Sequence, residues 1–253
     1  MPTISVITAV IDGRHNYLTD AWESLASQQL PEGWDWEWVV QEDGTTGRPM
    51  ACLPTDPRIR SAGGRRGGAG VARTMGLTRA TGDLVRALDA DDLLTPGALA
   101  RDISAMEEHP DIGWCISSCL DLLPDGSYKP GPNDPAAGPL SAETLRRQLE
   151  ADEFPVVGTH LVMRRDLVWA LGAWPAYPAL EALALVLFCA AVAPGLMITE
   201  PGGIYRKHDA MTTAGTGYRE DVNVPLLRSS ILHRMDALRS SGWTWSSTAK
   251  KGS

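Results

Sequence analysis

The sequence has no excess of positive charge. Its 253 residues include 23 Lys and Arg against 31 Asp and Glu, which gives a formal net charge of −8 at pH 7. Proteins that bind duplex nucleic acid usually carry a basic footprint that neutralises phosphates. The charge balance therefore argues against a nucleic acid as the main partner of this chain.

Cysteine is also scarce, with four residues spread widely over the chain. No charged and then apolar leader precedes them, so we expect a reducing, cytoplasmic setting in which they stay free thiols. Cys115 and Cys119 lie close together, but no His or further Cys follows at a zinc-ligand spacing. These two thiols are therefore expected to be buried core residues.

Long apolar runs and two common nucleotide-binding signatures are missing as well. The longest apolar run, residues 180–194, is shorter than the roughly 20 residues that span a bilayer, which predicts a buried helix and no integral membrane segment. No GxxxxGKS/T is present, and no GxGxxG follows the first predicted strand. These absences disfavour a P-loop enzyme, a nucleotidyltransferase and a Rossmann dehydrogenase.

What the sequence does contain is the composition of a packed protein, with 43% hydrophobic and 21% charged residues. A chain of this length commonly forms one α/β domain around a large core. Two regions are expected to be peripheral. The Pro- and Gly-rich stretch 123–139 is expected to be a surface loop or lid, and residues 243–253 a frayed tail.

Short β-branched runs alternate with helical spacings along the first 120 residues or so. Thr95 is the expected N-cap of one helix, with Pro96 in its first turn. The alternation predicts an α/β fold with a mostly parallel, Rossmann-like sheet and helices on both faces. Strands are predicted at 4–11, 36–41, 84–88 and 112–120, with a short one from residue 59, and helices at 18–28, 71–80 and 96–106.

Acids and glycines gather at the ends of three predicted strands, where open α/β sheets bind ligands. These segments are 42–44 (EDG), 63–70 (GGRRGGAG) and 89–92 (DADD). Residues 58–86 hold seven arginines and one acid, although the whole chain is acidic. A basic, glycine-rich loop that opens a helix suits a phosphate or diphosphate. A flexible turn with solvated arginines is the alternative.

Asp89 and Asp91 project to the same side of an extended segment, so both can face one hard cation such as Mg²⁺ or Mn²⁺. Without a cation, Asp89, Asp91 and Asp92 would raise one another's pKa at a buried strand end. An Asp-rich turn that caps a helix is the alternative. The neighbouring basic loop favours a cation shared with a diphosphate.

Taken together, these motifs resemble family 2 glycosyltransferases, which have the GT-A fold. The resemblance covers most of residues 3–210 and implies a nucleotide-sugar-binding half at 1–122, an acceptor-side half at 123–210, and a C-terminal helical extension and tail at 211–253. The motifs that carry it are ISVITAV at 4–10, EDG at 42–44, GAGVARTMGL at 68–77, TGDLVRALDADD at 81–92, GAWP at 172–175 and YRKH at 205–208.

The resemblance also implies the residues that bind the nucleotide sugar and the cation. Asp43 would contact the nucleobase, Arg73 would approach the nucleotide, and Asp89 would lie near the ribose or the metal. The Mn²⁺ or Mg²⁺ would be held by Asp91, with His208 reaching the metal or the diphosphate. The implied nucleotide-sugar site comprises Ala9, Val10, Asp12, Asp43, Gly68, Arg73, Asp89 and Ala90.

The family's inverting reaction uses a carboxylate base, usually the second acid of a Glu-Asp pair at a helix start. Here the matching pair is Glu181 and Ala182, so the second carboxylate is missing. Glu181 could itself be the base, with a pKa raised by its apolar helix, or another group could serve. Alternatively, Ala182 marks an inactive chain, or Glu181 is only an acid favoured by the helix dipole.

Acceptor-side residues are less well defined by the sequence. Trp174, in the loop before Glu181, is a candidate acceptor platform, and His160 is either an acceptor residue or a core histidine. Trp34, Trp36 and Trp38 alternate along a strand and are interpreted as packing residues.

The resulting hypothesis is a metal-dependent, inverting glycosyltransferase that uses a donor of the UDP or dTDP type. Its acceptor hydroxyl is expected on a soluble metabolite, peptide or glycan. A non-catalytic nucleotide-sugar-binding protein of the same fold is the alternative, because Ala182 stands at the usual position of the base.

Overall fold

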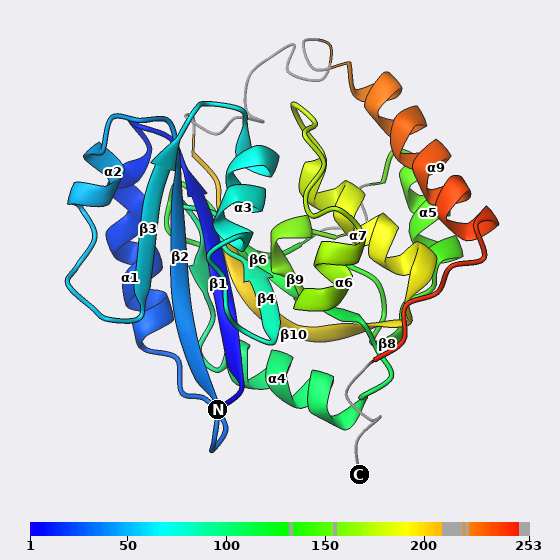
Figure 1. Ribbon diagram of the computed structural model, residues 1–253, viewed down its shortest axis with the longest axis horizontal. Helices are drawn as coiled ribbons and strands as arrows, with labels where there is room; N and C mark the ends of the chain where they lie inside the picture. Colours follow the sequence, from blue (N-terminus) through cyan, green and yellow to red (C-terminus); the bar gives the residue numbers. More distant parts are fainter. Residues whose placement is uncertain (132–133, 154–155, 209–219, 221–222, 248–253) are drawn as a thin grey trace.

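The computed structural model describes residues 1–131, 134–153, 156–208, 220 and 223–247. Helices pack on both faces of a curled sheet (Figure 1). In chain order, the first part contains β1 (Thr3–Val10), the short helix η1 (His15–Tyr17), α1 (Leu18–Ala26), β2 (Asp35–Asp43), α2 (Arg48–Ala51), β3 (Ile59–Gly64), α3 (Ala69–Leu77), β4 (Leu84–Ala87), β5 (Leu93–Leu94), α4 (Ala98–Glu108) and β6 (Trp114–Leu122). The second part contains β7 (Tyr128–Pro130), β8 (Gly138–Pro139), α5 (Ala142–Glu150), the short helix η2 (Gly158–His160), β9 (Leu161–Arg164), α6 (Arg165–Ala170), α7 (Glu181–Val192), β10 (Gly195–Arg206) and α9 (Val224–Ser240).

Parallel pairing joins the strands that carry the acids noted in the sequence. β1 pairs in parallel with β2 and β4, and β2 pairs in parallel with β3. β9 lies antiparallel between β4 and β6, and β10 is parallel to β6. Along the sheet the order is β3-β2-β1-β4-β9-β6-β10-β5. The mostly parallel α/β fold predicted from the sequence is confirmed.

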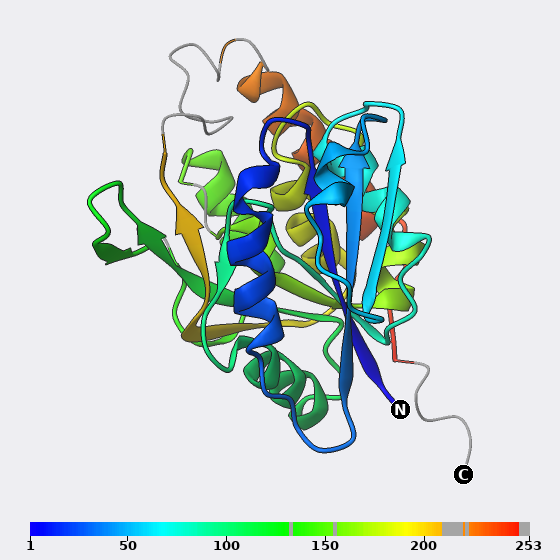
Figure 2. The ribbon, with the colours of Figure 1, turned by 90° about the vertical axis from the view of Figure 1, so that its left-hand side faces the viewer.

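Alternating side chains along β1 contribute to a separate core on each face of the sheet. Ile4 and Val6 pack with residues of α1 and α4, whereas Ile7 belongs to the cluster that includes α6 and α7. Figure 2 shows α1 lying across one face, with α4 below it. Residues 183–189 of α7 are all buried, which confirms the predicted buried helix. Within the described ranges, no helix combines the length and apolarity needed to cross a membrane.

Several smaller expectations about packing are also confirmed. Trp36 and Trp38 are 3% and 0% exposed and pack with Trp22, and Trp34 packs against the same cluster. Cys115 and Cys119 are buried free thiols. These tryptophans and cysteines are structural.

The predicted start of α4 is wrong. The helix begins at Ala98, and its N-cap is Gly97, which adopts a positive φ of 73°. Thr95 does not cap it, because its hydroxyl donates a hydrogen bond to the carbonyl of Pro201 in β10. The pairing of β5 with β10, just before Thr95, fixes this arrangement.

Two regions expected to be peripheral are partly built into the fold. Within 123–139, β7 pairs with β6 and β8 pairs with β10, while residues 132–133 lie outside the described residues. Trp245 is only 8% exposed, and its backbone N–H donates to the carbonyl of Val192 at 2.9 Å. The predicted frayed tail therefore docks at Trp245, and residues 248–253 are not described. α9, which lies in the predicted C-terminal extension, packs on α7 and α5 (Figure 1).

Candidate functional site

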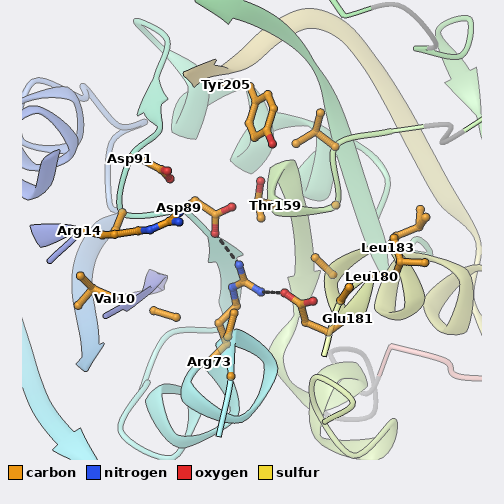
Figure 3. Close-up of a pocket in the computed structure, with 18 of the residues that line it drawn as sticks. Val10, Arg14, Arg73, Asp89, Asp91, Thr159, Leu180, Glu181, Leu183 and Tyr205 are labelled. Atoms are coloured by element: carbon orange, nitrogen blue, oxygen red, sulfur yellow. Dashed lines mark hydrogen bonds and ion pairs between the residues drawn. The ribbon is translucent and has the colours of Figure 1, made fainter. Parts of the chain in front are cut away.

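A cavity of about 840 Å³ lies at the carboxyl ends of β1, β2 and β4. The ends of these strands supply Val10, Asp43 and the segment 89–91 to one wall. The opposite wall comes from η2, the residues before α7 and the end of β10 (Figure 3). This is the edge where the sequence pattern placed the ligand site.

Asp43 fixes the glycine-rich loop that opens α3. Its carboxylate accepts hydrogen bonds from the backbone N–H groups of Gly67 at 2.6 Å and Gly68 at 3.0 Å. Gly68 has a φ of 92°, a conformation that glycine adopts without steric strain. Asp43 and Gly68 both line the cavity, so this bonding holds the start of α3 against it.

Arg73 links the two walls of the cavity (Figure 3). Its Nη2 donates to Oδ1 of Asp89 at 2.5 Å, and its Nη1 donates to Oε1 of Glu181 at 2.6 Å. The side chain of Arg73 is only 3% exposed. Burial alone would lower the pKa of Arg73, but the charges of Asp89 and Glu181 outweigh it and raise that pKa. The guanidinium is therefore a fixed positive charge shared by the two carboxylates.

The acids after β4 have three different environments. Asp89 pairs with Arg73, whereas Oδ2 of Asp91 lies 3.0 Å from Nε2 of His208. Asp92 is 1% exposed and accepts a hydrogen bond from the backbone N–H of Arg206 at 3.0 Å. Burial, with added repulsion from Asp89 and Asp91, raises the pKa of Asp92 well above its ordinary value. Only Asp89 and Asp91 of these three line the cavity.

Asp91 and His208 could hold a divalent cation if a bound diphosphate supplied its remaining ligands. The carboxylate and the imidazole converge within 3.0 Å, and both side chains are partly exposed. Among the described residues, no group of three or more His, Cys, Asp or Glu side chains is placed to hold a metal ion. Magnesium characteristically binds one or two carboxylates together with substrate phosphates, so Asp91 would supply the carboxylate and a bound diphosphate the phosphate oxygens.

Glu181 and Ala182 form the start of α7 at the far wall. The Glu181 side chain is 14% exposed and lines the cavity beside Ala182. Leu180, the N-cap of α7, has a φ of 60°, which is unusual for a leucine. Gly158 lies against the first turn of α7, because an ideal Cβ on Gly158 would lie 2.6 Å from the carbonyl carbon of Ala182.

Four of the predicted site residues lie outside the cavity lining, and one of them is His208, which contacts Asp91. Asp12 forms ion pairs with Arg48 and His15 instead. Trp174 is 3% exposed and belongs to the core, so it offers no platform to an acceptor in this structure. His160 is 2% exposed, and burial, together with the nearby Arg86 charge, lowers its pKa to about 3. The structure therefore favours the core-histidine alternative.

The cavity also contains residues that the sequence argument did not single out. Arg66 lies in the glycine-rich loop and Lys207 lies in YRKH, so both belong to motifs that were already noted. Asp121 lies near the carboxyl end of β6, so it is another acid at a strand end. Its Oδ1 pairs with Nζ of Lys207 at 3.2 Å. Arg14 and Thr159 had no comparable signal in the sequence.

Comparisons with known proteins agree with this fold. The profile of glycosyl transferase family 2 matches residues 5–172, and the chain belongs to this family. A segment of 117 residues is 31% identical to the O-antigen biosynthesis protein RfbC of Myxococcus xanthus. The match covers 44% of this chain but 9% of RfbC, so the chain spans less than a tenth of that relative.

Among solved structures, the chain is similar to TarS of S. aureus, residues 1–349. In complex with UDP-GlcNAc, TarS matches with a TM-score of 0.68 and 17% identity, over 96% of this chain and 74% of that one. The complex with UDP matches with a TM-score of 0.66 and 15% identity, over 95% and 70%. These similarities show that the fold is that of the GT-A glycosyltransferases, as the sequence resemblance implied.

Proposed function

We propose that this chain transfers a sugar from a nucleoside diphosphate sugar to an acceptor hydroxyl, with inversion at the anomeric carbon and with a divalent cation. One observation carries the proposal: a single cavity brings together Asp43, Arg73, Asp89, Asp91 and Glu181. A donor of the UDP or dTDP type is favoured, and the UDP and UDP-GlcNAc complexes of TarS support this class. The free thiols support a reducing, cytoplasmic setting.

In this proposal each wall of the cavity has its own role. Asp43 and the loop that it fixes bind the nucleobase end, and Arg73 stabilises negative charge near the diphosphate. Asp91 and His208 would hold the Mn²⁺ or Mg²⁺. When bound, such a cation neutralises charge on the leaving nucleoside diphosphate. We further propose that residues 1–122 bind the donor and residues 123–210 bind the acceptor.

Glu181 is the proposed base, because it is the carboxylate at the start of α7 and it lines the cavity. The acceptor oxygen bonds to the anomeric carbon while the bond from that carbon to the diphosphate oxygen breaks. The acceptor proton passes to the carboxylate of Glu181. Arg73 positions this carboxylate through its bond to Oε1.

A second candidate function is a non-catalytic protein that binds a nucleotide sugar. Ala182 favours it, because the family normally has its base at this position and an alanine cannot accept a proton. The two candidates share donor binding and differ in product formation.

The test is isothermal calorimetry with UDP, dTDP and GDP, each with and without Mn²⁺. We expect one uridine or thymidine diphosphate to bind, and Mn²⁺ to tighten its binding at least tenfold. Asp91→Asn should remove most of the Mn²⁺ effect, while Glu32→Gln, at an exposed acid between α1 and β2, should leave it intact. Failure of all three nucleotides to bind would contradict both candidate functions.

A further inference from the structure

The cavity has two walls of different chemistry. Its charged side chains lie mainly along the strand ends and the glycine-rich loop. Around the start of α7 the lining is apolar, apart from Glu181. We call this region the apolar wall, and it comprises Val156, Val157, Pro178, Ala179, Leu180 and Leu183.

Leu180 is held in a strained conformation within the apolar wall. Its φ of 60° lies in the left-handed region, which is sterically unfavourable for a leucine. The conformation is fixed because the Leu180 carbonyl accepts the N–H of Ala184 at 2.8 Å and so begins α7. Figure 3 shows the Leu180 side chain beside Glu181 at the cavity. The strained conformation of Leu180 therefore places its apolar side chain next to Glu181, the proposed base.

Thr159 is a polar group next to this wall. It lines the cavity and is 6% exposed, yet its hydroxyl oxygen has no hydrogen-bond partner among the described residues. Figure 3 places it between Tyr205 and the Glu181 side of the cavity. A buried hydroxyl without a partner is unfavourable, and a hydroxyl of a bound ligand would satisfy it.

We propose that the apolar wall binds the apolar body of the acceptor, which is a small alcohol with an alkyl or aryl group. This inference rests on the proposed function, because it assigns the acceptor class of the same site. A polysaccharide would lose water from many hydroxyls here and find few partners, whereas an alkyl or aryl group gains from burial. The acceptor hydroxyl then lies near Thr159 and Glu181.

The proposal is tested by calorimetry with 1-butanol, 1-hexanol and 1-octanol as probes and glucose as the polar control. Each probe is titrated into the full chain alone and into the chain saturated with UDP and Mn²⁺. Affinity should rise about three- to fourfold for each added methylene, as expected for burial of a CH₂ group. Glucose should bind at least tenfold more weakly than 1-octanol.

Leu180→Asn is the informative variant, because asparagine tolerates the left-handed conformation and removes the apolar side chain. It should weaken 1-octanol binding at least tenfold and change UDP affinity less than twofold. Leu226→Asn is the matched control, since Leu226 is 63% exposed and outside the cavity, and it should change neither. Leu180→Gly, which relieves the strain, should reproduce the loss if Leu180→Asn folds poorly.

Tighter binding of glucose than of 1-octanol, or equal effects of Leu180→Asn and Leu226→Asn, would overturn the inference. If UDP fails to bind while the alcohols show the expected series, the proposed function fails and the apolar ligand site remains. If UDP binds and the alcohol series is flat, the acceptor assignment alone is wrong.

Discussion

Arg73 is the residue on which the two walls of the cavity depend. Its guanidinium is buried and bonds to one carboxylate that follows β4 and to another at the start of α7. Removing one partner of a buried ion pair leaves charges that are neither hydrated nor paired. Here removal of the Arg73 guanidinium would leave the carboxylates of Asp89 and Glu181 in the same cavity without the positive charge that they share.

Arg73→Met is therefore expected to lower the free energy of unfolding by about 3–5 kcal/mol. Urea denaturation followed by circular dichroism measures this. Arg65→Met, at an exposed arginine of the glycine-rich loop before α3, should change it by less than about 0.5 kcal/mol. Equal effects of the two substitutions would mean that the buried pairing contributes little.

The two candidate functions give different expectations for substitutions at Glu181 and Ala182. If Glu181 is the base, Glu181→Gln should lower kcat by about 10²- to 10⁴-fold, because the amide cannot accept the acceptor proton. UDP binding should persist in this variant. Product formation by mass spectrometry and UDP calorimetry together measure the two effects.

Ala182→Asp is the complementary change, since it restores a carboxylate at the family's usual base position. Activity that appears only in Ala182→Asp, with none in the unaltered chain, would support the non-catalytic candidate and contradict the role proposed for Glu181. Turnover by the unaltered chain that Glu181→Gln removes would support the enzyme.

Among the structural elements, the close approach of α3 to the residues before α7 builds the site. Gly70, in the first turn of α3, makes this approach possible. An ideal Cβ on Gly70 would lie 2.4 Å from the carbonyl oxygen of Pro175 and 3.1 Å from Cγ of Glu181. The side chain of Arg73 reaches Glu181 across this contact.

Gly70→Ala should push α3 away from Glu181 and lower the free energy of unfolding by about 1–3 kcal/mol, because the added methyl overlaps backbone. It should also weaken UDP binding, since the loop before α3 moves with the helix. Gly64→Ala is the control: its Cβ would meet only the flexible end of Gln41, at 3.3 Å. Thermal denaturation and UDP calorimetry of both variants check the expectation.

The sequence predicts the larger helices and strands of the first 122 residues, where one local signal dominates. β-branched residues in β1 and the helical spacing of α1 gave bounds close to the observed ones. The start of α4 was missed because Thr95 bonds to a strand more than a hundred residues away. The docking of Trp245 was also missed because it depends on a residue that is distant in sequence. Its N–H donates to the carbonyl of Val192, and the residues around Trp245 show no pattern that predicts this contact.

The candidate site shows the same division between local and distant effects. Acids and glycines at strand ends indicated Asp43, Gly68, Asp89 and Asp91, because topology brings such ends together. Spacing could not reveal that Trp174 is buried, that Asp12 pairs with Arg48, or that Thr159 lines the cavity. These facts depend on side-chain packing between segments that are distant in sequence.

For the whole molecule, the buried His160 predicts how stability depends on pH. Its pKa is lowered to about 3, so the folded chain keeps it neutral while the unfolded chain protonates it near pH 6.5. Between these values the unfolded state binds more protons, and stability falls as the pH falls. His160 alone should therefore remove about 2 kcal/mol between pH 7 and pH 5.

The measurement is the free energy of unfolding of the unaltered chain and of His160→Gln at several pH values from 7 to 5. The slope of the unaltered chain should exceed that of His160→Gln over this interval. His109→Gln, at an exposed histidine, should keep the original slope. Parallel curves for all three proteins would show that His160 is protonated equally in both states.

The order of strands in the sheet has a further consequence for engineering and for evolution. β9 lies between β4 and β6, and β10 lies between β6 and β5, so segments from beyond residue 160 sit between strands from the first 122. A chimera joined near residue 122 would exchange the strands that flank the aspartates after β4, together with any acceptor-side residues. If the acceptor binds around the start of α7 as proposed, substitutions there would change the acceptor preference without disturbing this strand order, which the exchange of whole segments would disrupt.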